Sequence, residues 1–391
     1  MLHFVENLGE TMTVEIRQMK TRQEKESFLI FPWQHYQNDP VWTPPLMPDV
    51  RERIDEKRGA WFKRGIAEFY LVFDGEQTVG SFCVGVDQKA NETNSKQEAV
   101  FGFFEVIEDF VVAEAMFAFM ETWALAHNMH SLYGPFNLDY EDNYGALLEG
   151  FETPQVMLCA QTKPYYAYYF TKHGFEKARA DNIAMRIDLT EERPEFVKLN
   201  KMADRIRERG TYSIRHADFS RWDEEIDILH KLLNRSLAHL EGHIPWERPA
   251  VESLVSQFRR IADEDLILFA VDNTTGETIG FLPGTPDMNE HFKRFDGLRH
   301  WWNYPGFLLN FKKPTDCLTV KSVLLLPEYW GGGVAILMFD ELVQRILKLD
   351  GYTWIDLSLT SSENPQTPRI AHKLGAETYR SYRVFRKLLD G

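Results

Sequence analysis

The sequence predicts an α/β protein made of two tandem domains of one kind, each a mixed, mostly antiparallel sheet flanked by helices. Three observations support this fold class. The chain has 391 residues, which is long for a single hydrophobic core. Segments of its first half return in the same order in its second half. Each half also alternates between short apolar runs typical of strands and stretches with the spacing of amphipathic helices.

The internal repeat is carried by three pairs of segments. Residues 13–17 resemble residues 211–215, an offset of 211 − 13 = 198. Residues 75–80 resemble residues 276–280, where 276 − 75 = 201, and residues 172–175 resemble residues 373–376, where 373 − 172 = 201. Each pair alone is weak, but three pairs in order at nearly constant spacing favour a duplication.

The elements of each half follow one order. A first strand and helical sequence precede a hairpin, which turns at Asp74-Gly75 in the first half and at residues 273–276 in the second. These turn residues supply the backbone angles of tight hairpins. A third strand, a long helix, a strand, a helix and a last strand complete the half. Residues 87–98 are acidic and polar, and we expect a surface loop there.

The boundary between the halves is expected at a helical stretch. Residues 191–209 have helical character and stop at Gly210, a glycine suited to a helix end. We therefore expect domains at residues 13–190 and 211–391, joined by a helical linker at residues 191–210.

Composition limits the partners. A net charge of −15 argues against a nucleic-acid ligand, which needs clustered Lys and Arg. The three cysteines are scattered, so neither a disulfide framework nor a metal site is expected. No apolar run is long enough to span a bilayer, and the start lacks a signal-peptide pattern. We expect a cytoplasmic protein with no membrane partner, and the oligomeric state stays open.

Residues 319–359 carry the clearest chemical signal. Residues 319–326 are an apolar, β-branched run typical of a buried strand, which Pro327 ends. Three glycines, residues 331–333, precede apolar positions at helical spacing in residues 334–349. The first N–H groups of a helix lack partners and lie at the positive end of its dipole, so a pyrophosphate can sit there. A glycine run alone is as often only a flexible turn.

Residues 327–335 resemble the coenzyme A loop of the GNAT family of acyl-CoA-dependent N-acyltransferases, written (Arg/Gln)-x-x-Gly-x-(Gly/Ala). Gly333 and Ala335 match the loop's glycine and its last small residue, whereas Trp330 replaces the Arg or Gln. Further along, Asn364 resembles the family's asparagine, and Ala371 stands where many members have a tyrosine. The resemblance spans residues 211–389 and implies acetyl-CoA or another acyl-CoA as the co-substrate.

The first half shares the order of elements but not the loop. Residues 103–110 have no glycine turn after Gly102. We therefore expect this half to be degenerate and to bind no coenzyme.

The resemblance also implies which residues hold the coenzyme. They are the strand end, the glycine turn, the start of the helix and the downstream asparagine. A backbone N–H of Leu325 or Leu326 would stabilise the oxyanion. The expected coenzyme-binding residues are Leu324, Leu325, Leu326, Trp330, Gly331, Gly332, Gly333, Val334, Ala335 and Asn364.

Direct attack by an amine calls for a base and an acid. Glu241 and His243 are candidate bases, because their segment borders the acceptor side of this fold, and Tyr382 is a candidate acid. Such side chains are more often solvated or structural, and a water chain without a dedicated base is another alternative. Further candidates are Asp287 and Asn289 for the base, and Tyr379 and His372 for the acid.

Two aromatic runs lie outside these motifs. Residues 301–304 and 165–169 either line an acceptor pocket or pack in the core and between domains.

These signals predict an acyltransferase that moves an acyl group from acyl-CoA to a small-molecule or peptide amine. The alternative is a binding or regulatory protein of the same fold without turnover, motivated by Trp330 and Ala371. An aminoacyl-tRNA-dependent transferase fits the duplication but not the negative charge.

Overall fold

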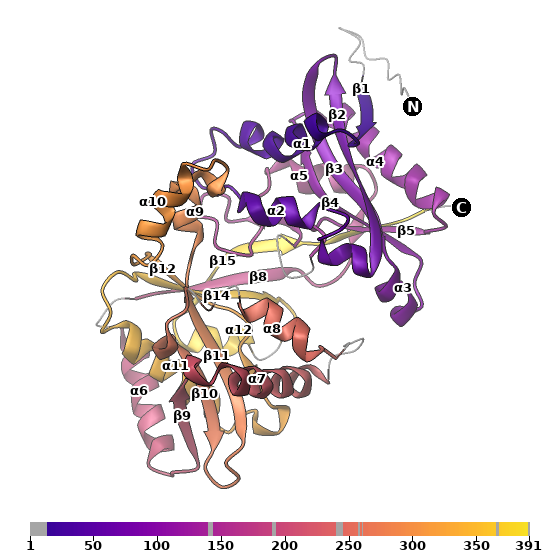
Figure 1. The fold of residues 1–391 in the computed structure, drawn as a ribbon. Coiled ribbons are helices and arrows are strands. Elements are labelled where there is room, and N and C mark those ends of the chain that lie inside the picture. Colours follow the sequence, from indigo (N-terminus) through magenta and orange to yellow (C-terminus); the bar gives the residue numbers. More distant parts are fainter. Residues whose placement is uncertain are drawn as a thin grey trace.

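The structure is a computed structural model that describes residues 14–139, 144–189, 193–239, 245–256, 259, 261–364 and 367–389. It has two lobes, each built on a mixed sheet with flanking helices (Figure 1). The predicted fold class is confirmed.

The first half of the chain supplies eight strands and five helices to the described structure. The strands are β1 (Val14–Gln18), β2 (Gly65–Asp74), β3 (Gln77–Asp87), β4 (Glu98–Val106), β5 (Ser131–Gly134), β6 (Ala146–Glu149), β7 (Glu176–Lys177) and β8 (Asn182–Asp188). The helices are α1 (Arg22–His35), α2 (Met47–Arg53), α3 (Gln88–Asn94), α4 (Phe110–Ala126) and α5 (Tyr165–Lys172).

The second half begins with α6 and ends with β16. Its helices are α6 (Pro194–Arg207), α7 (Trp222–Leu237), α8 (Arg248–Ser256), α9 (Asn289–Arg294), α10 (Asn303–Asn310), α11 (Val334–Ile346) and α12 (Thr367–Lys373). Its strands are β9 (Tyr212–His216), β10 (Ile267–Asp272), β11 (Thr278–Pro286), β12 (Cys317–Val320), β13 (Leu324–Leu325), β14 (Trp354–Ser361), β15 (Glu377–Arg383) and β16 (Phe385–Leu388).

The repeat is visible in the two sheets. The first has the order β1-β2-β3-β4-β5-β16-β7, and the second β6-β15-β8-β14-β12-β11-β10-β9, with β13 also on β11. Each sheet has one parallel contact, β4 with β5 and β12 with β14, at equivalent places. Both predicted hairpins, β2-β3 and β10-β11, are confirmed.

The halves exchange strands, which corrects the predicted domain limits. β16, from the chain end, lies between β5 and β7 of the first sheet, while β8 lies between β14 and β15 of the second. Figure 1 shows β8, coloured as part of the first half, beside β14 of the second lobe. The segments 13–190 and 211–391 are therefore repeats in sequence but not independent sheets. Because the halves are similar, each offers a slot that the other's last strand can fill.

Two smaller expectations also need correction. The predicted loop at residues 87–98 contains helix α3, which Asp87 caps by accepting a hydrogen bond from the Ala90 N–H. The predicted linker is part of the second lobe, because Ile206 of α6 packs with Leu337 of α11. Arg207 also pairs with the fully buried Asp340 at 2.7 Å.

Three further observations concern the cysteines, metal-ligating side chains and helix lengths of the described residues. The three cysteines are free and buried, and the described part of the chain holds no group of side chains arranged for a metal ion. Among its helices, none combines the length and apolar character that crossing a bilayer requires.

Candidate functional site in the second lobe

The strand predicted at residues 319–326 is interrupted. β12 ends at Val320, Ser322 adopts a left-handed conformation with φ +55°, and β13 resumes at Leu324. Both pieces pair with β11, but β14 pairs with β12 only as far as Thr319↔Asp356. In the described structure β13 and β14 therefore part, which leaves backbone groups of β13 facing the opening.

The direction of these groups distinguishes the two predicted oxyanion donors. The Leu326 N–H donates to the Ile279 carbonyl at 3.0 Å and is used within the sheet. Because N–H groups alternate in direction along a strand, the Leu325 N–H points to the other side, toward the opening. The Leu325 carbonyl points the same way and accepts a hydrogen bond from Trp330 Nε1 at 3.1 Å. Leu325, and not Leu326, can supply the donor.

The predicted glycine turn and helix are both present. Gly331 and Gly333 have φ +80° and +90°, and α11 starts at Val334 with no side-chain cap on its first N–H groups. A Cβ on Gly331 would meet nothing within 4 Å, whereas one on Gly333 would lie 2.6 Å from Ile206 Cδ1. The turn is thus packed on one side against α6 and open on the other, as an anion site requires.

The downstream part of the predicted coenzyme site has structural roles. Asn364 Oδ1 accepts a hydrogen bond from the Thr367 N–H at 3.2 Å, which places it at the start of α12. Ala371 is buried in the core. The coenzyme contact expected of Asn364 stays a prediction.

A buried charged group lies where β12 and β14 part. Lys321 Nζ is 2.8 Å from Asp356 Oδ2, and the Tyr379 hydroxyl donates to Asp356 Oδ1 at 2.9 Å. Asp356 is fully buried. Burial works to lower the pKa of Lys321, but the Asp356 carboxylate outweighs it and the pKa is raised. The lysine therefore stays charged.

Asp287, just after β11, adjoins this group. Its Oδ1 accepts hydrogen bonds from the N–H groups of Met157 at 3.0 Å and Asn289 at 3.3 Å. Burial raises the pKa of Asp287 to about 7, the two N–H groups and Lys321 oppose the rise, and Asp356 adds to it. A carboxyl group with a pKa near neutrality can both take up and release a proton.

A segment from the first half of the chain covers Asp287 and completes the site. Met157 belongs to a segment from the first half of the chain that follows β6 of the second sheet, and the fully buried Arg380 of β15 holds that segment in place. Arg380 donates to Thr153 Oγ1 at 2.8 Å, to the Ala160 carbonyl at 3.1 Å and to Gln161 Oε1 at 3.0 Å. The pairing of β6 with β15 thus places a segment from the first half of the chain over a carboxyl group of the second half.

The other predicted catalytic residues lie either outside the described residues or in positions with structural contacts. Glu241 and His243 lie outside the described residues. Tyr382 is fully buried and accepts a hydrogen bond from Arg380 at 3.2 Å, a structural position that does not favour the predicted acid role. His372 contacts the Ala376 carbonyl at the end of α12.

Sequence reasoning missed Lys321 and Asp356 and named Asp287 and Tyr379 only as secondary candidates. A signal was present, because each missed residue is an isolated charge within an apolar strand. Such a residue is rarely buried without a partner of opposite charge.

The equivalent helix end in the first lobe is capped by a side chain. Its helix α4 is capped by Asp109, which accepts a hydrogen bond from the Val111 N–H at 2.8 Å. Behind it, Phe104 stacks on Phe117 with ring centroids 5.3 Å apart. A carboxylate therefore lies where the second lobe has a helix end without a side-chain cap.

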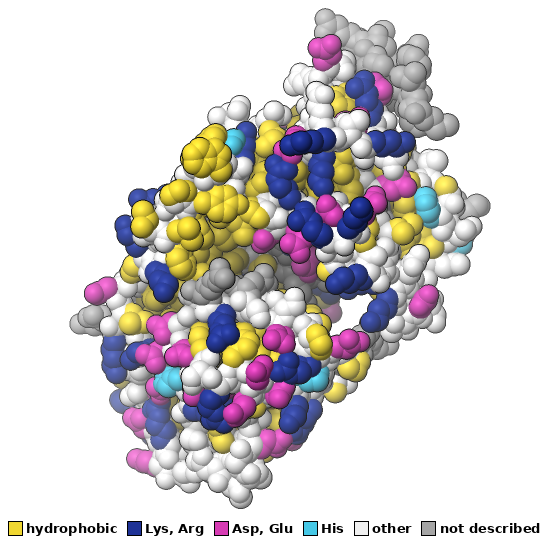
Figure 2. Space-filling view, in the orientation of Figure 1, with side chains coloured by type: hydrophobic (Ala, Val, Ile, Leu, Met, Phe, Trp, Pro, Cys, Tyr) yellow, Lys and Arg dark blue, Asp and Glu magenta, His cyan; other side chains and the backbone are white. Residues whose placement is uncertain are grey.

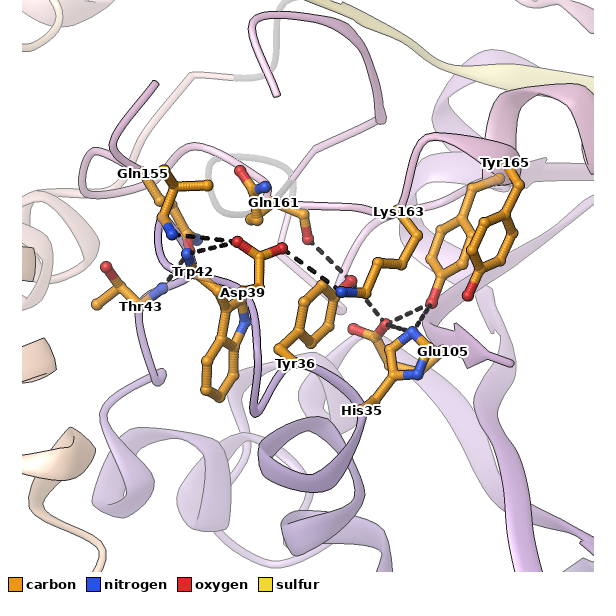
Figure 3. Close-up of polar contacts among 12 residues, drawn as sticks. His35, Tyr36, Asp39, Trp42, Thr43, Glu105, Gln155, Gln161, Lys163 and Tyr165 are labelled. Carbon is orange, nitrogen blue, oxygen red and sulfur yellow. Dashed lines mark hydrogen bonds and ion pairs between the residues drawn. The ribbon is translucent and has the colours of Figure 1, made fainter. Parts of the chain in front are cut away.

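Glu105 of β4 sits in this filled region (Figure 3). Its Oε2 accepts hydrogen bonds from the hydroxyls of Tyr36 at 2.9 Å and Tyr166 at 2.7 Å. The Tyr166 hydroxyl also contacts His35 Nε2 at 3.0 Å. Burial raises the pKa of Glu105 to about 7 and lowers that of His35 to about 4. This group is a packed polar core without a free helix end.

Polar contacts lead from this core to Gln155 (Figure 3), which in turn contacts Asn289 of the second half. Lys163 lies over the Tyr36 ring and 3.5 Å from Asp39 Oδ2. The loop after Asp39 reaches Gln155, whose Oε1 accepts from the Thr43 N–H at 2.9 Å. The Gln155 carbonyl accepts from Asn289 Nδ2 at 3.0 Å, next to Asp287 in the chain. The first lobe therefore supports the position of the carboxyl group.

Comparison with known proteins agrees with the fold. No protein-family model matches the chain. The chain is 26% identical over 383 residues to protein YghO of Escherichia coli, with 95% of each chain covered. It is 25% identical over 380 residues to the bacterial ceramide synthase of Caulobacter vibrioides, covering 95% of this chain and 96% of that one.

Solved structures match over nearly the whole length. A tandem GNAT protein from the clavulanic acid biosynthesis pathway has a TM-score of 0.58 at 11% identity and covers 97% of this chain and 99% of its own. A GCN5-related N-acetyltransferase from Sphaerobacter thermophilus has a TM-score of 0.54 at 12% identity, with coverage of 97% and 96%.

Proposed function

Because the chain is a tandem GNAT-fold protein, we propose that it is an N-acyltransferase that uses acyl-CoA and acts in its second lobe. The observation that carries the proposal is the α11 helix end. It has an open glycine turn, no side-chain cap and a parted pair of strands beside it. The diphosphate of coenzyme A matches such an electropositive helix end.

The reaction would use three groups around the opening. The acceptor amine forms a C–N bond with the thioester carbonyl carbon, and the Leu325 N–H stabilises the oxyanion. Asp287 accepts the proton that the amine loses. The C–S bond then breaks, and the thiolate of coenzyme A takes up a proton. Lys321 holds the Asp356 carboxylate and keeps the neighbouring charges fixed.

For the acceptor, we propose a long-chain amino alcohol. The support is similarity to a bacterial ceramide synthase along nearly the whole chain, since a ceramide is a fatty acyl amide of such an amine. At 25% identity the acceptor is the finer part of the proposal.

The test is turnover with purified protein. Acyl-CoA donors from acetyl to palmitoyl are combined with sphinganine and with a short water-soluble amine, and thiol release and the amide product are both measured. We expect an amide and an equal amount of free coenzyme A. Thiol release without amide, or neither product with any pair, would contradict the proposal.

A second candidate is a binding or regulatory protein of the same fold. Trp330 favours it, because it stands in place of the loop's basic residue and bonds to the Leu325 carbonyl at the opening. This candidate predicts thermal stabilisation by coenzyme A without thiol release.

A further inference from the structure

A helix between β11 and β12 exposes an unusual amount of apolar surface. The aromatic run at residues 301–304 neither lines a core nor packs between the lobes, because its large side chains point outward. Figure 2 shows apolar side chains gathered over α9 and α10 and extending toward the hollow between the lobes. We call this the α10 surface. Its members, with their exposed fractions, are Trp301 78%, Trp302 58%, Tyr304 40%, Leu308 63% and Leu309 82%.

Single exposed leucines are ordinary, but a cluster of this size on one short helix is not. The opposite side of α10 packs against other aromatic rings, although none of its residues is fully buried. Phe307 contacts Phe292 and Phe295 with ring centroids 6.1 Å apart in each case, and Phe311 stacks on Phe307 at 5.8 Å. The exposed apolar residues of α10 therefore lie on the side away from these aromatic contacts.

The charges around the α10 surface indicate its partner. Residues 289–313 hold five Lys and Arg against two acids, a balance of 5 − 2 = +3 in a chain of net charge −15. Both acids accept hydrogen bonds from groups within the protein. Glu290 accepts hydrogen bonds from the N–H groups of Asp316 and Cys317, and Asp296 accepts one from Trp33 Nε1 at 2.7 Å. The basic residues are Lys293, Arg294, Arg299, Lys312 and Lys313.

Apolar side chains, Trp and Tyr, and a basic rim are the features of a surface that rests on anionic lipid. A second copy of this acidic chain is a poorer partner. Its charge suits the basic rim but not the apolar centre of the α10 surface. We propose that the α10 surface docks the protein on the face of an anionic lipid bilayer, with Trp301 and Leu309 inserted among the headgroups. This is surface contact, and so differs from the spanning segment whose absence led to the expectation of no membrane partner.

The α10 surface lies in the chain between Asp287 and the charged group of Lys321 and Asp356. The segment that carries it leaves β11 directly after Asp287 and returns at β12, beside the charged group. A lipid amine taken from the bilayer would thus arrive next to the proposed base. This last step rests on the proposed function, whereas docking itself does not.

The test is co-sedimentation with vesicles of phosphatidylcholine, with and without phosphatidylglycerol, without acyl-CoA. We expect binding to the anionic vesicles that weakens with salt. The double substitution Trp301→Ser with Leu309→Ser should weaken it at least tenfold, because it removes the two apolar side chains that insert into the bilayer. Lys312→Glu with Lys313→Glu should weaken binding only to anionic vesicles.

A matched control replaces Val197 and Met202 on α6, which are 51% and 47% exposed, with Ser. It should bind vesicles like the natural protein. Equal binding by the control and the α10 variant would overturn the proposal. So would absent vesicle binding together with a dimer that the α10 variant disrupts, which would make the surface an interface between copies.

Turnover separates the two proposals. The α10 variant should acylate the short water-soluble amine normally and lose rate only with vesicle-borne sphinganine. Vesicle binding without turnover of any amine would leave docking intact and contradict the proposed function. Turnover without any vesicle binding would support the proposed function and contradict docking.

Discussion

The two lobes share one strand order but treat the same helix end in opposite ways. In the second lobe α11 starts at Gly333 without a side-chain cap, beside strands that part. In the first lobe Asp109 caps α4, and aromatic rings fill the space behind it. A carboxylate satisfies the same N–H groups that would otherwise hold a phosphate. The comparison teaches that a capping side chain, together with the ring packing behind it, distinguishes the helix end of the first lobe from the uncapped helix end of the second.

The buried carboxyl groups continue the comparison. Asp287 and Glu105 both have pKa values raised to about 7 by burial. Glu105 is enclosed by tyrosine hydroxyls, whereas Asp287 adjoins the charged group at the opening. We propose a catalytic role for the titration of Asp287 and expect the titration of Glu105 to affect stability alone.

The largest expected effect is that of Asp287→Asn. The amide keeps an oxygen for the N–H groups of Met157 and Asn289 but cannot accept the amine proton. We expect kcat to fall at least 100-fold with little change in the dissociation constant for coenzyme A. Because the base must be deprotonated, kcat/KM of the natural protein should rise with pH through about 7. An unchanged profile in the variant would remove Asp287 from the mechanism. Glu105→Gln is the matched control and should keep kcat.

The second-largest expected effect is that of a negative charge at Gly331 on the affinity for coenzyme A. Gly331→Asp and Gly331→Asn impose the same backbone strain at φ +80°, and only the first adds a negative charge. We expect coenzyme A to bind the Asp variant about tenfold more weakly than the Asn variant, by titration calorimetry. Equal affinity in the pair would show that the diphosphate lies elsewhere.

Glu105→Gln tests the first lobe through stability. Folding raises the pKa of Glu105 from 4.5 to about 7, so the folded state holds a proton that the unfolded state releases. Stability is therefore unaffected below pH 4.5, falls as the pH rises to about 7, and stays reduced above it. Since the side chain is 19% exposed, we expect the variant to gain about 1–2 kcal/mol over the natural protein between pH 4 and pH 8, measured by urea unfolding. A gain independent of pH would contradict this.

The smallest effect is that of Asp109→Ala. Loss of the cap should cost about 0.5–1 kcal/mol of stability and leave coenzyme A affinity unchanged. Appearance of a second coenzyme site in this variant would mean that the cap alone, and not the ring packing behind it, closes the first lobe.

The sequence predicted the local parts of this account. Asp74-Gly75 and the glycines before Val334 specify turns through their own backbone, so the hairpin and the helix start were readable. Strand exchange could not be predicted from the sequence, because β8 and β16 pair with partners far away in the chain. Lys321 and Asp356 lie 35 residues apart, and only the parallel pairing of β12 and β14 joins them. The position of Met157 over Asp287 depends on Arg380, a contact that no local pattern indicates.

We propose one coenzyme site for this chain, at the start of α11. A crystal structure of the complex with coenzyme A tests it most directly. The account predicts the diphosphate on the backbone N–H groups of residues 331–335, with the pantetheine arm running along β13 toward Asp287. A diphosphate at α4, or coenzyme A bound away from the parted strands, would contradict it.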